Sequence, residues 1–233
     1  MYYQYIGIDK YNFINNIKDL DKIINKQDIY KIDISKHKLK VLNDLSAFTN
    51  LKELYCENNL LKELPKLPKF LRILHCFKNK LIELPKLPLQ LKELHCDHNH
   101  LVKLSKLPNS LIELKCFNNK LIELPNLPIN LEILYCSYNK LVSIPKLPNS
   151  LKLLNCTDNR IVKLPRLPIK IKNLKCINNV FKGKPKCIML CKNLSYYKKY
   201  NKYKTLKSIN IFTNCKINYY YNYRIMKYYY KQK

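Results

Sequence analysis

Residues 71–90 read LRILHCFKNKLIELPKLPLQ, and residues 91–110 read LKELHCDHNHLVKLSKLPNS. The two segments agree at their leucines, their cysteine and their asparagine, and they differ mainly at the residues between these. The same spacing recurs at 51–70, 111–130, 131–150 and 151–170, and a copy at 171–190 loses the pattern after Phe181. A divergent 22-residue version without the prolines precedes them at 29–50. Consecutive copies at one period indicate a repeat architecture.

The consensus LxxLxCxxNxLxxLPxLPxx, numbered here as positions 1 to 20, predicts the local structure of each copy. Leucine at position 4 and cysteine at position 6 alternate with variable residues at 3, 5 and 7, which predicts a short strand with one buried face. The Leu-Pro-x-Leu-Pro segment cannot be helical, because proline lacks an N–H and clashes with the preceding turn. We expect the asparagine at position 9 to bond backbone groups in its own turn and in the neighbouring copy.

This pattern resembles the leucine-rich repeat, in the short twenty-residue class seen in bacterial type III effectors. The amino-acid bias also resembles that of leucine-rich repeat proteins of giant amoeba-infecting DNA viruses. The resemblance implies an α/β repeat protein, a right-handed solenoid with a parallel sheet on its concave side and an extended or polyproline-like convex side. It implies a binding scaffold and no particular activity.

The pattern divides the chain into three predicted parts. Residues 1–28 form an N-terminal capping segment with one helix, since Phe13, Ile17, Leu20 and Ile24 fall on one helical stripe. Residues 29–190 form the solenoid, with eight coils, and 191–233 form a basic C-terminal cap and tail rich in Tyr and Lys. We expect a helix around 187–206. No signal peptide or apolar run of about 20 residues is apparent, which predicts an intracellular protein, in the host cytoplasm if the chain is viral.

The positive charge is uneven along the chain. The net charge is +28, and residues 159–233 contain 20 basic residues and no acidic one. In coils 51–170, positions 2, 3, 5, 7 and 8 carry seven acidic and six basic residues, whereas the other positions carry three acidic and fourteen basic ones. A nucleic acid or an anionic membrane would therefore meet the tail and the convex side, not the strands. AT-rich base composition is a competing explanation of this charge.

The ten cysteines suit a reducing compartment. Seven of them occupy position 6, and we expect them to be buried as small apolar side chains. A structural zinc site at Cys176, Cys187, Cys191 and Cys215 is the alternative, although no Cys-x-x-Cys motif is present.

Any binding specificity must lie in the residues that vary, because the scaffold is uniform. Aromatic and apolar side chains grouped on the outward strand positions indicate a binding surface. The candidate partner-binding residues are Tyr55, Ile73, His75, Phe77, His95, Asp97, Lys115, Phe117, Ile133 and Tyr135. His75 and His95 on adjacent copies could also chelate a metal, but we expect no metal and no cofactor.

The sequence contains no catalytic motif, and its two glycines exclude a phosphate-binding loop. We therefore expect a non-enzymatic module that binds a protein on its concave strand face. The alternatives are a nucleic-acid or anionic-membrane binder acting through the basic tail and the convex lysines, and a structural protein without a specific partner.

Overall fold

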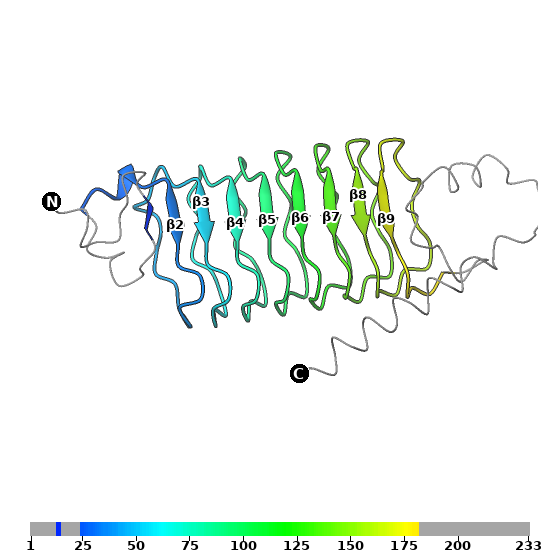
Figure 1. Cartoon of the computed structure of the whole chain (residues 1–233), viewed down its shortest axis with the longest axis horizontal. Helices are drawn as coiled ribbons and strands as arrows, with labels where there is room; N and C mark the ends of the chain where they lie inside the picture. The colour runs from blue at the N-terminus through cyan, green and yellow to red at the C-terminus, as the bar shows by residue number, and fades with distance from the viewer. Residues whose placement is uncertain (1–12, 15–23, 182–233) are drawn as a thin grey trace, which may run out of the picture. The chain divides into compact units, whose positions relative to one another are not determined.

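The computed structural model describes residues 13–14 and 24–181. Within them lies one sheet of parallel strands whose order follows the sequence (Figure 1). The strands are β1 (Phe13–Ile14), β2 (Lys31–Asp33), β3 (Glu53–Tyr55), β4 (Ile73–His75), β5 (Glu93–His95), β6 (Glu113–Lys115), β7 (Ile133–Tyr135), β8 (Leu153–Asn155) and β9 (Asn173–Lys175). From β3 onward each residue pairs with the residue twenty positions later, so equivalent positions of successive coils form straight columns. The predicted parallel solenoid is confirmed.

The core consists of these columns, stacked behind the sheet. The leucines at positions 1 and 4 and the cysteines at position 6 are fully buried in the coils from 51 to 170, as Leu111, Leu114 and Cys116 show at 0% exposed. The divergent coil at 29–50 continues the core with Ile32 and Ile34. Each buried leucine contributes about 1.5–3 kcal/mol. A single coil buries too little to fold alone, so stability depends on stacking neighbouring coils.

The asparagine at position 9 ties each coil to the previous one. The side-chain nitrogen of Asn99 donates to the carbonyls of Cys76 and Cys96 at 3.0 and 3.1 Å. Its side-chain oxygen accepts from the backbone N–H of Leu81 at 3.0 Å. The same set of bonds recurs at Asn79, Asn119, Asn139, Asn159 and Asn179. The predicted role of this residue is confirmed.

The turn that follows each strand is left-handed at position 8. The backbone φ there is between 51° and 54° in every coil from Asn58 to Asn178, and Lys78, His98 and Tyr138 adopt it as well. Asparagine and aspartate tolerate this conformation better than other non-glycine residues. The chain therefore keeps a uniform turn without glycine, at a conformational cost where the residue is long or aromatic.

The prediction of an N-terminal helix is wrong at the two places where the structure describes its residues. Phe13 forms strand β1 together with Ile14, and β1 pairs in parallel with β2. Ile24 is 92% exposed, so it does not belong to a packed apolar stripe. The only helical turn among residues 13–14 and 24–181 is the 3-10 helix η2 (Lys26–Asp28). The edge of β2 is covered by the paired strand β1 and not by the expected helix. Ile17, Leu20 and the C-terminal cap and tail lie outside the described residues.

The Leu-Pro segments contain neither helix nor strand, as the prolines require. Each closes with a turn such as the one in which Leu71 N–H donates to Pro68 O at 3.2 Å. Polyproline geometry and a right-handed coil stay predictions. Among the residues with described structure, there is no helix of the length and apolar character that crossing a bilayer would require.

Candidate protein-interaction surface

The strand face, meaning the side of the sheet that carries positions 3, 5 and 7, holds all the candidate residues. Strand register places two columns side by side on it. The position 5 column runs Tyr55, His75, His95, Lys115 and Tyr135, and the position 3 column runs Glu53, Ile73, Glu93, Glu113 and Ile133. All ten candidate residues and three unpredicted glutamates thus come from five neighbouring strands or the residues just after them.

Aromatic rings stack along the position 5 column. The His75 and His95 rings lie nearly parallel, with centroids 4.1 Å apart. The Tyr55 ring meets His75 edge-on at 4.8 Å. Farther along, the Lys115 ammonium lies over the Tyr135 ring, 6.0 Å from its centroid. Neighbouring parallel strands are about 4.8 Å apart, which matches the stacking distance of planar rings. The column is therefore a preordered row of rings.

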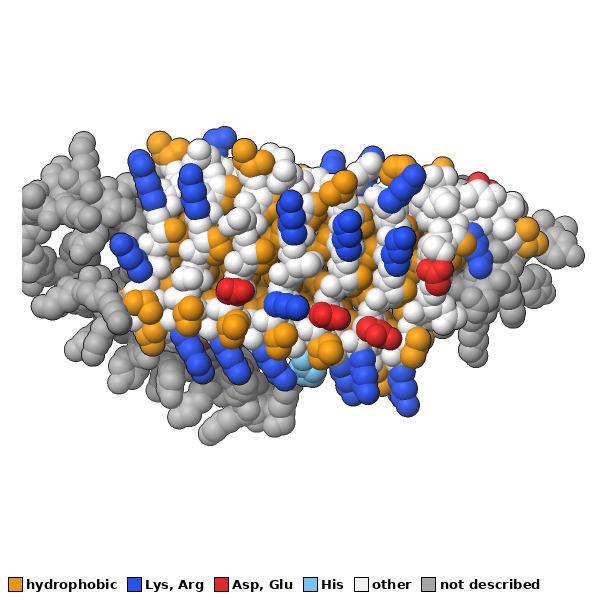
Figure 2. Space-filling view, turned by 180° about the vertical axis from the view of Figure 1, so that it is seen from behind, with side chains coloured by type: hydrophobic (Ala, Val, Ile, Leu, Met, Phe, Trp, Pro, Cys, Tyr) orange, Lys and Arg blue, Asp and Glu red, His pale blue; other side chains and the backbone are white. Residues whose placement is uncertain are grey.

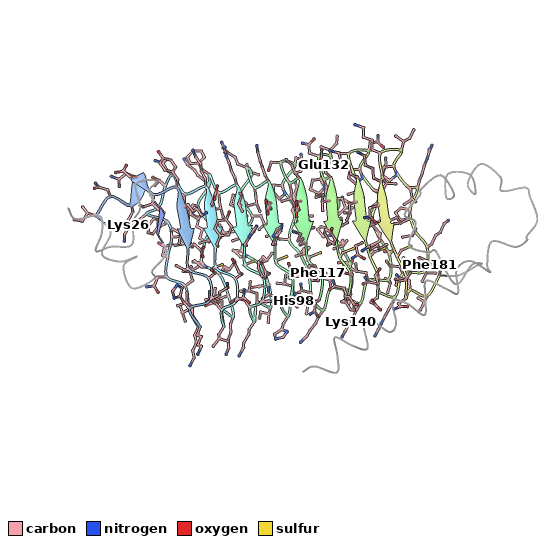
Figure 3. All side chains as sticks on the ribbon, in the orientation of Figure 1. Lys26, His98, Phe117, Glu132, Lys140 and Phe181 are labelled. Atoms are coloured by element: carbon pink, nitrogen blue, oxygen red, sulfur yellow. The ribbon has the colours of Figure 1, made fainter. Side chains whose placement is uncertain are left out.

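The position 7 residues extend this row toward the turns. Phe77 lies 6.2 Å from the His75 ring, and Phe117 meets the His98 ring edge-on at 5.0 Å (Figure 3). Asp97 lies between the two phenylalanines in the column, and its Oδ2 is 2.9 Å from His98 Nδ1. Both phenylalanines are half-buried. They pack against imidazoles and do not stand free in water.

The expectation that these positions all face solvent is wrong at two of them. His95 is 8% exposed and Asp97 is 5% exposed, so both are buried. The reason is lateral packing: side chains from the flanking coils lie against both sides of a residue in the middle of a column. The centre of the strand face is therefore a polar layer that is already largely enclosed.

Two glutamates that the sequence did not single out connect the histidines. Glu93 Oε1 lies 2.7 Å from His75 Nε2 and 3.1 Å from His95 Nε2. Glu113 Oε1 lies 3.0 Å from His95 Nε2 and 2.8 Å from Lys115 Nζ. The signal was available, because positions 3 and 5 must share a face in a strand. It was missed because each glutamate serves a histidine of the preceding coil as well as a neighbour in its own.

This layer is electrostatically asymmetric. Burial lowers the pKa of His95, and the neighbouring His75 and Lys115 lower it further. This favours the neutral imidazole. Burial works against ionisation of Glu113, but its bonds with Lys115 and His95 outweigh this and lower its pKa. Burial and the Glu53 carboxylate raise the pKa of Tyr55 to about 12, and its hydroxyl lies 3.1 Å from Glu53 Oε2. The site thus combines an imidazole biased toward its neutral form, at His95, with a carboxylate biased toward its charged form, at Glu113.

A groove of about 420 Å³ runs across β3 to β6 at positions 2 and 3. Its lining has three kinds of side chain. Lys52, Arg72 and Lys92 are basic, Glu53, Glu93 and Glu113 are acidic, and Ile73 and Ile112 are apolar. The groove therefore offers both charge signs together with two apolar side chains, beside the row of rings.

The seven position 6 cysteines are buried, as predicted. The Cys56 thiol lies 3.4 Å from the His75 carbonyl and the Cys96 thiol 3.4 Å from the Lys115 carbonyl. Burial raises the pKa of the Cys156 thiol to about 12 and raises that of the others from Cys56 to Cys136 further. Such thiols are poor nucleophiles and poor metal ligands. Cys187, Cys191 and Cys215 lie outside the described residues.

One group of side chains has the composition of a metal site. The ligand atoms of His75, Glu93 and His95 all lie within 4.8 Å of one another. The sequence pointed to the two histidines, but the expectation was that no metal binds. The structure adds the carboxylate that a pair of histidines alone would lack.

A second apolar surface was missed entirely. At position 12, Ile82, Val102, Ile122 and Val142 are 50% to 59% exposed. Figure 2, which views the molecule from behind, shows hydrophobic side chains in a row beside charged ones of both signs. Val102 N–H donates to Ile82 O and Val142 N–H to Ile122 O, so the coils stay paired along this stripe. A column of β-branched residues at one position was the available signal.

Solved structures similar to this chain include bacterial leucine-rich repeat proteins. YopM from Yersinia enterocolitica is 39% identical over 65% of this chain and 34% of its own, with a TM-score of 0.64. YopM from Yersinia pestis, described as a leucine-rich effector protein, is 29% identical over 64% of this chain and 49% of its own, with a TM-score of 0.56. A Shigella effector leucine-rich repeat domain is 26% identical over 74% of this chain and 76% of its own, with a TM-score of 0.57.

The match is to part of the longer proteins, since this chain spans about a third of one YopM and about half of the other. No protein-family model matches the sequence. No curated protein matches it either.

The parallel columns, the asparagine bonds and these similarities define a class, the solenoid proteins built from leucine-rich repeats. Within that class, the repeats of this chain match those of the bacterial effector-type proteins.

Proposed function

We propose that the chain is a non-enzymatic interaction module that binds a protein partner on the strand face. The observation that carries the proposal is the row of ordered rings from Tyr55 through His75 to His95, which lies beside the groove. The similar structures are leucine-rich repeat proteins, two of them described as effectors, which supports an interaction role in general.

Rigid aromatic side chains suit this role for an energetic reason. Protein interfaces obtain much of their affinity from a few aromatic or arginine anchors in desolvated positions. An anchor that is already held loses little conformational entropy on binding. Tyr55 is held by Glu53, and His75 is held by Glu93 and by its three ring neighbours. The partner would therefore meet a surface that is formed before it arrives.

The groove indicates what kind of partner segment would fit. Its basic residues at position 2 and its acidic residues at position 3 form two parallel rows. An extended peptide segment with both charge signs and apolar side chains between them would match these rows and the isoleucines. A nucleic acid would meet the acidic row directly, so the groove does not favour it.

The proposed setting is the interior of a host cell, with the chain as a viral or effector-like protein. The support is the similarity to bacterial effectors together with the reduced, buried cysteines. The candidate residues of the proposed site remain Tyr55, Ile73, His75, Phe77, His95, Asp97, Lys115, Phe117, Ile133 and Tyr135.

The test compares two pairs of substitutions in the full chain. Phe77→Ala with Phe117→Ala alters the strand face, whereas Ile82→Ser with Ile122→Ser alters the exposed stripe. Proteins captured from cell lysate would be quantified for each, and a purified captured protein would then be titrated. We expect the first pair to weaken binding at least tenfold, about 1.4 kcal/mol, and the second to leave it unchanged. The reverse result would move the interface to the stripe.

A second candidate rests on the charge distribution. Residues 159–233 carry 20 basic residues and no acidic one, which suits nucleic acid or an anionic membrane. Such binding would weaken steeply with salt, whereas burial of aromatic anchors would not. Titrating the captured protein and a mixed-sequence RNA at low and high salt separates the two functions. Salt-insensitive protein binding supports the strand face, and RNA binding as the only salt-sensitive interaction supports the tail.

A further inference from the structure

The geometry on strands β4 and β5 goes beyond a protein-binding surface. His75 and His95 are register partners on adjacent parallel strands, and Glu93 stands two residues before His95 on the same strand. Since side chains two residues apart point to the same face, all three project together from the sheet. The backbone columns, and not a flexible loop, hold the three groups in place.

The hydrogen bonding around His95 leaves acceptors in excess. Its Nε2 lies 3.1 Å from Glu93 Oε1 and 3.0 Å from Glu113 Oε1, and it can present at most one proton. Glu93 Oε1 also faces His75 Nε2 at 2.7 Å. Two carboxylate oxygens and two imidazole nitrogens thus converge on one small region. Lys115, through its 2.8 Å bond to Glu113, supplies one compensating charge at its edge.

We propose that His75, Glu93 and His95 bind a divalent transition-metal ion of the zinc class. The ligand atoms lie within 4.8 Å of one another, and zinc with bonds of about 2.0–2.2 Å holds its ligand atoms roughly 3.3 Å apart in a tetrahedron. Closing the site therefore needs only small rotations of the imidazole rings. Glu93 already lies near that spacing from both nitrogens.

The ligand set selects among metals. Two imidazoles and one carboxylate suit zinc, cobalt, nickel and copper, while calcium and magnesium prefer all-oxygen sites. The seven repeat cysteines are buried away from the strand face, so they do not convert the site to a thiolate site. Three protein ligands leave one position open, which faces the partly exposed side of His75 and Glu93.

The experiment titrates the full chain with zinc chloride in the absence of any partner, so its result is independent of the proposed protein binding. His75→Ala, Glu93→Gln and His95→Ala are compared singly with wild type by calorimetry. The control is His98→Ala with His100→Ala, which removes two histidines of the same coil that lie outside the group. Cys187, Cys191 and Cys215 stay in every variant, so zinc that they bind cancels in the comparison.

We expect each ligand substitution to abolish one zinc equivalent or weaken it at least tenfold, with the control unchanged. Cobalt added in place of zinc should give the visible absorption of a four- or five-coordinate nitrogen and oxygen site, and this absorption should disappear in His95→Ala. Circular dichroism of each variant checks that the solenoid is intact. Equal zinc binding by wild type and all three ligand variants would overturn the proposal, as would loss of the site in the control alone.

Discussion

The imidazole rings of His75 and His95 stack at 4.1 Å with only 13° between their planes. This contact exists because the two residues occupy the same position of successive coils. A twenty-residue period makes them neighbours across a sheet, and the glutamate of the second coil then reaches both. Most of the side-chain contacts that distinguish the strand face join residues of successive coils in this way.

Removing a core leucine should be costly. Leu114 is 0% exposed, and Leu114→Ala is expected to lower the free energy of unfolding by about 2–5 kcal/mol, through lost burial and a cavity. Cys116→Ser should also destabilise, because it places a hydroxyl in an apolar position. Circular dichroism melting curves measure both. Unchanged melting in both variants would contradict the assignment of positions 4 and 6 to the core.

The asparagine column should be as important as the leucines. Asn99→Ala removes four hydrogen bonds and leaves the N–H of Leu81 and the carbonyl of Cys76 buried without that partner. We expect a loss of at least about 2 kcal/mol. Asn109→Ala, at an exposed position of the next turn, is the matched control and should change stability by less than about 0.5 kcal/mol. Equal denaturation midpoints would show that these bonds contribute nothing.

The strained turn predicts opposite effects at two nearby lysines. Lys78 has a φ of 52°, so Lys78→Gly should cost nothing or stabilise by up to about 1 kcal/mol. Lys80, two residues later, is also exposed and does not have a positive φ. Lys80→Gly should therefore destabilise, by roughly 0.5–1 kcal/mol. Chemical denaturation would measure the two differences, and a Lys78→Gly variant less stable than Lys80→Gly would refute the argument.

The repeat cysteines should be unreactive while the chain is folded. Because burial raises the pKa of Cys156 to about 12, its thiol stays protonated at roughly pH 8, near the ordinary value for cysteine. Alkylation followed by peptide mass mapping should leave Cys56 to Cys156 unmodified in native buffer and modify them in denaturant. Rapid native modification of these peptides would mean that the core opens readily.

The phenylalanines of the strand face should affect binding more than stability. Phe77 and Phe117 are half-buried against His75 and His98 and lie outside the leucine core. The double change to alanine is therefore expected to lower stability by less than the loss of Leu114, while the partner is lost. Thermal melting alongside the binding assay measures the two effects, and a melting temperature as low as that of Leu114→Ala would place the rings in the core.

The sequence by itself determined the coil. Its period of twenty, its leucines at positions 1 and 4 and its prolines left one way to bury the apolar side chains, because alternation specifies a strand and proline forbids a helix. It also indicated the buried cysteines and the cross-coil role of the asparagines. Each of these follows from a local pattern repeated many times.

Only the tertiary structure decided which variable residues meet. It placed Glu93 between two histidines, enclosed His95 and Asp97, and exposed the stripe from Ile82 to Val142. It also put Phe13 in a strand where a single apolar stripe had indicated a helix. Equivalent residues of successive coils become neighbours only when the strands are aligned in space. The chemistry of the strand face depends on side chains twenty residues apart, whose packing no local pattern records.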